Sequence, residues 1–154
     1  MALSKALEAF LAKPHLGICA TIRKDGSPHL TVVWYEWADG EVRLTITDSR
    51  VKYKNVMRDP RVSLCVTANE HPYKEVVLEG KAIVEAKGGP ELFRRLALKY
   101  DGNIEGDKYA NYSLGKDNRL VLRFKPDRIM RWDFAEEDDD HEPWRYNRQL
   151  GSNM

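Results

Sequence analysis

Short runs in which hydrophobic and polar residues alternate fill most of the first half of the chain. Residues 16–47 contain three such runs, rich in β-branched and aromatic side chains, and Asp-Gly turn signals at 25–26 and 39–40 separate them. Turns of this kind join neighbouring antiparallel strands. The pattern therefore predicts a three-stranded meander over residues 16–47.

Further strands are expected in the second half of the chain. Residues 61–68 and 74–86 predict one strand each, and residues 119–134 predict one strand followed by a short second one. Strands joined mostly by hairpins argue against a parallel, doubly wound sheet. They favour a mostly β fold, a small antiparallel barrel with peripheral helices, because closure removes exposed sheet edges.

Helical spacing of apolar residues interrupts the strands at three places. An amphipathic N-terminal helix precedes Pro14, a second helix is expected within residues 49–60, and a third within residues 88–102. The polar stretch 103–118 has room for one more short helix. These helices are expected to lie at the periphery of the barrel.

One domain accounts for most of the chain. A length of 154 residues and a hydrophobic fraction of 42% suit a single domain with its own core. We assign residues 1–134 to a barrel domain and residues 135–154 to a charged C-terminal tail. The acidic run of the tail lacks the ligand spacing of a calcium loop, so no metal site is predicted. Trp144 and Tyr146 are costly to leave in water, and we expect them to pack on a partner subunit or to cap a groove.

Charge and hydropathy argue against several kinds of partner. With 25 basic and 24 acidic residues the formal net charge is only +1, whereas nonspecific nucleic-acid binders carry a basic excess. No apolar run approaches the roughly 20 residues that span a bilayer. Cys19 and Cys65 lie in apolar runs without a second metal ligand nearby, which favours buried free thiols and a cytoplasmic location. We therefore expect no nucleic-acid partner and no membrane span.

A cluster of cations and hydroxyls follows the third strand-like run. Arg50 and Lys52 would diverge on a helix but share one side of an extended segment. Thr45 and Thr47 precede them with the same alternation, and Ser49 is a plausible helix N-cap. Together with a helix N-terminus these groups would hold a phosphate. A solvated, charged helix start remains the alternative from spacing alone.

Two segments carry a family resemblance. "GICATIRKDGSPHLTVVWYEW" and "RLTITDSRVKYKNVMRDPRVSLCV" resemble the pyridoxamine 5′-phosphate oxidase-like superfamily, and most of all its branch that uses the deazaflavin coenzyme F-420. The resemblance runs from about residue 16 to residue 132. It implies a six-stranded antiparallel split β-barrel, the FMN-binding split barrel. It also implies a homodimer with one cofactor in each of two grooves between the subunits.

The resemblance also assigns cofactor contacts. It places the tricyclic ring beside the first three strands and the phosphate at the Arg-x-Lys pair, with help from the hydroxyls of the preceding strand. A polar residue of the following helix and an aromatic residue from a loop of the partner subunit complete the set. The implied cofactor-binding residues are Thr21, Val33, Trp34, Thr45, Thr47, Arg50, Lys52, Asn55 and Tyr73.

The function expected from these features is hydride transfer. The chain has no nucleophile motif and no metal-protease motif, and a hydride-carrying cofactor needs mainly position and electrostatics from the protein. We therefore expect an oxidoreductase that uses F-420 to reduce a small, conjugated organic substrate, with no catalytic residue assigned. An FMN-dependent oxidoreductase or flavin reductase is one alternative, and a non-catalytic cofactor or tetrapyrrole carrier is another.

Two further residue assignments stay open at this level. His29 lies near the ring strand, although a surface histidine beside a hairpin is the preferred interpretation. The glutamate tail of F-420 has candidate partners in three basic residues of the second helix and the following strand, namely Lys54, Arg58 and Arg61. Basic surface residues are common in any soluble protein, so an ordinary charged surface is the alternative for these three.

Overall fold

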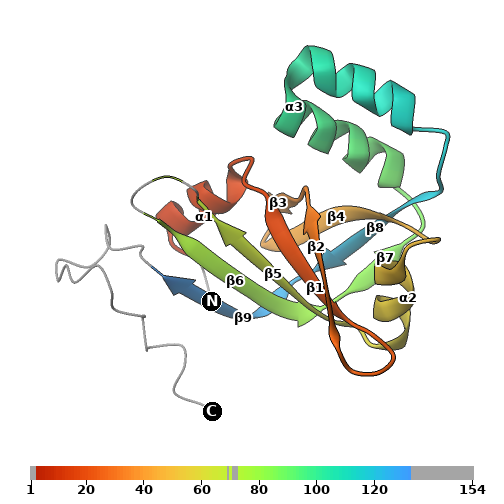
Figure 1. Cartoon of the computed structure of the whole chain (residues 1–154). Coiled ribbons are helices and arrows are strands. Elements are labelled where there is room, and N and C mark those ends of the chain that lie inside the picture. The colour runs from red at the N-terminus through yellow and green to blue at the C-terminus, as the bar shows by residue number, and fades with distance from the viewer. Residues whose placement is uncertain (1–2, 69, 71–72, 133–154) are drawn as a thin grey trace.

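The structure is a computed structural model that describes residues 3–68, 70 and 73–132 (Figure 1). Its elements, in chain order, are α1 (Lys5–Ala12), β1 (Gly17–Ile22), β2 (Pro28–Val33), β3 (Glu36–Ala38), β4 (Glu41–Thr47), α2 (Val51–Arg58), β5 (Arg61–Thr67), β6 (Glu75–Lys81), β7 (Ile83–Glu85), α3 (Gly89–Ser113), β8 (Arg119–Phe124) and β9 (Pro126–Trp132). The predicted tail, residues 135–154, and the end of the predicted domain at residue 134 lie outside the described residues.

Two antiparallel sheets enclose the core. One has the strand order β2-β1-β5-β6-β9 and the other the order β3-β4-β8-β7. Every pairing between these strands is antiparallel. Figure 1 shows the sheets wrapped around each other, with the helices outside them. The predicted mostly β fold with peripheral helices is confirmed.

The described part of the chain has nine strands rather than the six that were expected. Three extended runs bend from one sheet into the other, so that β2 and β3, β6 and β7, and β8 and β9 are separated by at most two residues. The predictions of one strand over 74–86 and of a three-stranded meander over 16–47 are therefore wrong at the bends. Counted as extended runs, β1, β2–β3, β4, β5, β6–β7 and β8–β9 make six.

Close backbone contact at one bend explains a glycine. A Cβ atom at Gly80 would lie 2.7 Å from the carbonyl oxygen of Lys125, which no real Cβ tolerates. Lys125 is the residue between β8 and β9, and Gly80 pairs with Pro126 across a register shift. The two runs can cross this closely because residue 80 has no side chain.

The interior side chains are aliphatic and almost fully buried. Alternate residues of the strands point inward, and the most deeply buried members of this core include Val42, Leu44, Leu64, Leu78 and Leu122. Burial of each such side chain contributes about 1.5–3 kcal/mol. Helix α1 adds Leu7, Phe10 and Leu11 to the same core, and the Ser4 hydroxyl accepts a hydrogen bond from the Leu7 backbone N–H at 3.2 Å. The amphipathic N-terminal helix was predicted correctly.

Helix α3 covers the outer face of the four-stranded sheet. It has two arms because Gly102 leaves the helical conformation at φ 81° and ψ 173°, so the predicted helix over 88–102 and the short helix after it are both present. The arms fold against each other (Figure 1). A Cβ at Gly106 would come within 2.3 Å of the Ala97 carbonyl oxygen, so glycine permits this close contact. The Arg94 guanidinium also joins the arms through an ion pair with Asp107.

Candidate functional site

Two cations mark the start of α2. Arg50 occupies the N-cap position with an extended backbone, φ −83° and ψ 150°, and Lys52 lies in the first turn. Neither side chain forms an ion pair within the described part of the chain. Burial lowers the pKa of Lys52, and the charge of Arg50 lowers it further. The structure therefore brings the predicted pair together and leaves its charge uncompensated.

The predicted cap of this helix is wrong. Arg50, not Ser49, holds the N-cap position, and no side chain caps the helix. Ser49 is exposed, and its hydroxyl lies 3.2 Å from the hydroxyl of Thr47. The first backbone N–H groups of α2 are consequently not used by a side-chain cap. Such groups attract anions.

Strand β2 presents unpaired polar atoms on its inward side. His29 Nδ1 and Thr31 Oγ1 are both buried and have no hydrogen-bond partner among the described residues. Burial lowers the pKa of His29, followed by the charges of Arg23 and Lys52. His29 is half-buried in the structure, and the charge of Lys52 acts on it. A buried polar atom without a partner costs free energy unless a ligand or water supplies one.

Thr31 was missed by the sequence interpretation. Its signal was available, because Thr31 lies midway between His29 and Val33 on the same side of β2. In the register of the sheet Thr31 pairs with Cys19, a buried thiol whose pKa burial raises to about 11. Lys52 lowers the pKa of the same thiol, which again places Lys52 beside the β1–β2 pair. Because β2 is the edge strand of its sheet, these groups lie at the border of the barrel.

The side chains of Thr21 and Asn55 are hydrogen-bonded to each other. The Asn55 side-chain amide donates to Thr21 Oγ1 at 3.0 Å, and both residues are almost fully buried. The side-chain oxygen Oδ1 of Asn55 accepts a hydrogen bond from the Arg58 guanidinium at 3.1 Å. The two predicted cofactor contacts thus join α2 to β1 in this structure.

The remaining hydroxyls of the predicted site lie on the other sheet. Thr45 pairs with Val121 and Thr47 pairs with Arg119, on the face of the four-stranded sheet that α3 covers. Thr47 is 5% exposed, and Thr45 is half-buried. Arg50 therefore lies between this face and the β1–β2 pair beside Lys52. We call this region, at the start of α2, the Arg50–Lys52 corner. Arg119 was not foreseen from the sequence.

The predicted ring contacts separate into two environments. Val33 belongs to the main core and is 9% exposed. Trp34, the next residue, packs against α3, where its ring stacks on Tyr100 with 5.3 Å between centroids and meets Tyr109 edge-on. Trp34 thus helps to hold α3 on the barrel.

Tyr73 lies far from this corner within one chain. It is 49% exposed and follows β5, whereas α2 precedes β5. A seven-residue strand spans roughly 20 Å, and Figure 1 shows the start of β6, which Tyr73 precedes, at the opposite end of the barrel from α2. Tyr73 therefore does not reach Arg50 and Lys52 of its own chain.

The basic residues considered for an acidic tail are partly engaged elsewhere. Arg58 donates to the backbone carbonyl of Ile22, and Arg61 pairs with Asp59, with 2.6 Å between the nearest nitrogen and oxygen. This partner lowers the pKa of Asp59 to about 2. Lys54 is exposed and has no ion pair among the described residues.

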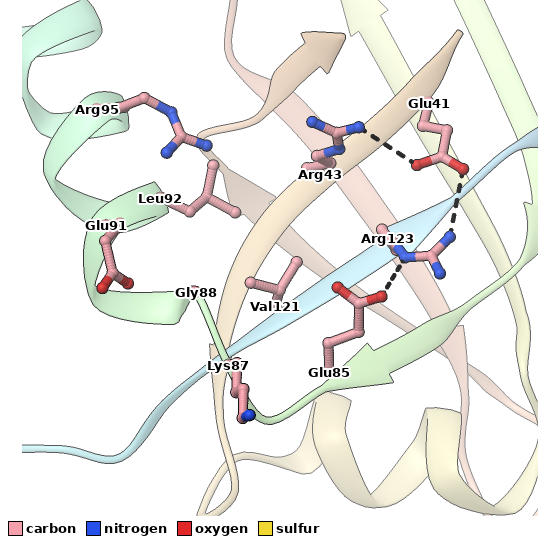
Figure 2. Close-up of a pocket in the computed structure, with 10 residues that line it drawn as sticks. All are labelled: Glu41, Arg43, Glu85, Lys87, Gly88, Glu91, Leu92, Arg95, Val121 and Arg123. Atoms are coloured by element: carbon pink, nitrogen blue, oxygen red, sulfur yellow. Dashed lines mark hydrogen bonds and ion pairs between the residues drawn. The ribbon is translucent and has the colours of Figure 1, made fainter. Parts of the chain in front are cut away.

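A separate pocket of about 390 Å³ opens at the start of α3 (Figure 2). Four of its charged side chains form ion pairs within it, because Arg123 pairs with Glu41 and Glu85, and Arg43 also pairs with Glu41. None of the predicted cofactor residues lines it. We interpret this pocket as an ion-pair network on the face of the sheet.

An apolar row crosses the outer face of the five-stranded sheet. Its members pair with one another in the register of neighbouring strands, and they are Val32, Ile18, Cys65, Val77 and Met130. Val32 is 66% exposed and Ile18 is 39% exposed. Cys65 is a free thiol, but it is half-buried in this row rather than in the core as predicted. The row is exposed at its β2–β1 end and half-buried along the rest, and an apolar surface of this kind indicates an interaction surface.

The corner fits a cofactor that carries a phosphate. The uncompensated charges of Arg50 and Lys52 suit an anion, and the unpaired atoms of His29 and Thr31 suit a polar ligand next to it. The described residues contain no cluster of side chains suited to holding a metal ion. Nor does any described helix have the length and hydropathy needed to cross a bilayer.

Comparison with known proteins agrees with the fold. The sequence profile of the pyridoxamine 5′-phosphate oxidase family matches residues 3–133, so the chain belongs to this family. The family binds flavins and includes oxidoreductases.

Solved structures of similar fold include a conserved hypothetical protein from Mycobacterium tuberculosis. It is 29% identical over 92% of each chain, with a TM-score of 0.69. An F-420 reductase is 23% identical over 82% of this chain and 98% of its own, with a TM-score of 0.68. A haem-binding protein from Mycobacterium smegmatis is 24% identical over 85% of this chain and 55% of its own, with a TM-score of 0.58.

Proposed function

We propose that the protein is an oxidoreductase that uses the deazaflavin coenzyme F-420 to reduce a small, conjugated organic substrate. The observation that carries this proposal is the uncompensated Arg50–Lys52 pair at the start of α2, beside the unpaired polar atoms of β2. We assign this cofactor-binding role to residues 1–134. When bound, the cofactor would supply a hydride, and the protein would supply position and electrostatics.

We assign the following roles to the site residues. Arg50 and Lys52 bind the phosphate, and Thr45 and Thr47 support it from the end of β4. Val33 and Trp34 lie where β2 leads into β3, and the tricyclic ring of the cofactor would lie beside them. Thr21 and Asn55 hold α2 against β1, so they position the clamp. Tyr73 of the partner subunit would close over the ring.

A homodimer is part of the same proposal. The apolar row on the outer face of the five-stranded sheet supports it, because the row would be covered by a second copy. The place of Tyr73 at the opposite end of the barrel also supports it. Each groove would then receive residues from two subunits.

Two other functions have specific support. FMN carries a phosphate on the same kind of chain, so the Arg50–Lys52 pair suits it equally, and the family binds flavins. A haem-binding protein shares the fold, which supports a carrier without turnover as the third candidate.

Titration of the purified protein with F-420, FMN and haem separates the candidates. We expect F-420 to bind most tightly and its reduced form to turn over with conjugated acceptors. Because F-420 carries more charge, its affinity should fall more steeply with added salt than that of FMN. FMN that copurifies in stoichiometric amounts and resists displacement by F-420 would refute the deazaflavin assignment. Tight haem binding without turnover would favour the carrier.

A further inference from the structure

Arg119 is a half-buried cation whose donors are only partly used. Its guanidinium carbon lies 3.8 Å from the centre of the Phe93 ring, and its Nη2 donates to the Ser113 hydroxyl at 3.1 Å. Its Nε is buried and has no partner among the described residues. No carboxylate of the described residues forms an ion pair with it. One face and one nitrogen of the guanidinium are therefore fixed, and its Nε is left without a partner among the described residues.

The two arms of α3 hold this side chain in place. Phe93 belongs to the first arm, and Ser113 ends the second arm. The backbone at the start of β8 is also closely packed against α3, because a Cβ at Gly89 would lie 2.0 Å from the Arg119 carbonyl oxygen. An arginine held by an aromatic face and a hydroxyl, rather than by an acid, keeps its charge for another partner.

Arg119 is also next to the proposed phosphate clamp. It pairs with Thr47 in the β4–β8 register, and the Thr47 carbonyl oxygen accepts a hydrogen bond from the Arg50 backbone N–H at 3.1 Å. Burial lowers the pKa of Arg119, the nearby charges of Asp117 and Tyr109 raise it, and the charge of Arg50 lowers it, so Arg50 and Arg119 act on each other although Asp117 is also near. Arg50 thus has one cation, Lys52, on the β2 side and a second, Arg119, on the α3 side.

We propose that Arg119 is a third cation of this site and binds a second anionic group of the ligand whose phosphate lies at Arg50 and Lys52. The proposal rests on the proposed anion-binding function. It deepens that function by assigning a side of the groove to an acidic extension, such as the glutamate carboxylates of F-420. FMN has no such second group. Arg119 should therefore distinguish the two cofactors, in a way that Arg58 and Arg61 cannot while they hold their present partners.

The test compares Arg119→Gln with Arg123→Gln. Arg123 is on the same strand and the same face, four residues further on, so its variant removes the same charge from the ion-pair network instead. We expect Arg119→Gln to weaken F-420 binding by roughly 10-fold or more and FMN binding by less than about 2-fold. Arg123→Gln should change neither. Arg119→Lys should recover only part of the loss, because lysine lacks the fork.

A second measurement does not depend on the ring of the ligand. The thermal midpoint of the wild type should rise more with pyrophosphate than with phosphate, and Arg119→Gln should abolish the difference while circular dichroism stays unchanged. Equal weakening of F-420 and FMN, or unchanged F-420 binding, would overturn the proposal. If the wild type binds FMN and not F-420, the proposed function fails, and the pyrophosphate comparison still decides the role of Arg119.

Discussion

The side-chain amide of Asn55 donates a hydrogen bond to the hydroxyl oxygen of Thr21, with 3.0 Å between the two atoms. Asn55 is on α2 and Thr21 is on β1, so this bond fixes the helix that carries the cation pair. Because both groups are buried, neither can exchange its partner for bulk water.

Asn55→Leu should destabilise the fold more than it changes the chemistry of the clamp. It leaves the Thr21 hydroxyl buried without its donor, at a cost of about 1–3 kcal/mol. Denaturant unfolding measures this change. Thr21→Val should cost a similar amount. The double variant should cost less than the sum of the two, because each single variant leaves one buried group unpaired and the double variant leaves neither. Strict additivity would mean that the hydrogen bond contributes nothing.

The cation pair predicts a specific loss of cofactor affinity. Arg50→Gln or Lys52→Gln should each remove a charge-assisted contact worth about 1.5–3 kcal/mol, roughly 10- to 100-fold in Kd. Lys54→Gln is the matched control, because Lys54 lies on the same helix and is exposed. The thermal midpoint should not fall in any of the three, and removal of the half-buried charge in Lys52→Gln should raise it. Unchanged affinity in the double variant would place the phosphate elsewhere.

Lys52 predicts a dependence of apo-protein stability on alkaline pH. Burial lowers its pKa below the ordinary value of 10.5, so the folded state binds fewer protons than the unfolded state between the two values. The free energy of unfolding should therefore gain a contribution that rises with pH across this interval and is constant below it. Urea unfolding at a series of pH values up to about 10.5 measures this contribution by comparison with Lys52→Met, which lacks it.

Phosphate binding should show the opposite trend. An anion favours the charged lysine, so affinity should weaken as pH rises through the lowered pKa of Lys52. Lys52→Arg keeps its charge throughout this range and should abolish the weakening. If the wild type and Lys52→Arg weaken in parallel, the lysine does not contact the anion.

The apolar row predicts a dimer that a single charge can break. Val32→Glu places a carboxylate at the most exposed end of the row, on the edge strand β2, and should give a monomer in sedimentation velocity at micromolar concentration. Ile83→Glu is the control, because Ile83 is 51% exposed on the other sheet and should leave the dimer intact. A monomeric wild type would remove this part of the proposal.

The sequence predicted the class of fold because its strongest signals were local. Asp-Gly turns and alternation located the strands, and the pattern around residue 50 located the cation pair. The bends were not visible, since alternation continues through Ala82 while the chain passes into the other sheet. The contacts of Arg119 and Trp34 depend on how α3 folds over the barrel, which no local pattern of β8 or β2 contains. Ser49 looked like a cap from its residue type, but the helix starts one residue later.

The runs that bend between the sheets have a consequence for how the molecule opens. Because β2–β3, β6–β7 and β8–β9 each belong to both sheets, neither sheet can separate without unpairing strands of the other. Backbone amides in the centres of β1 and β8 should therefore exchange with solvent through the same global opening, although they lie in different sheets. The second arm of α3 contributes no strand to either sheet, so its amides should exchange through a smaller, independent event.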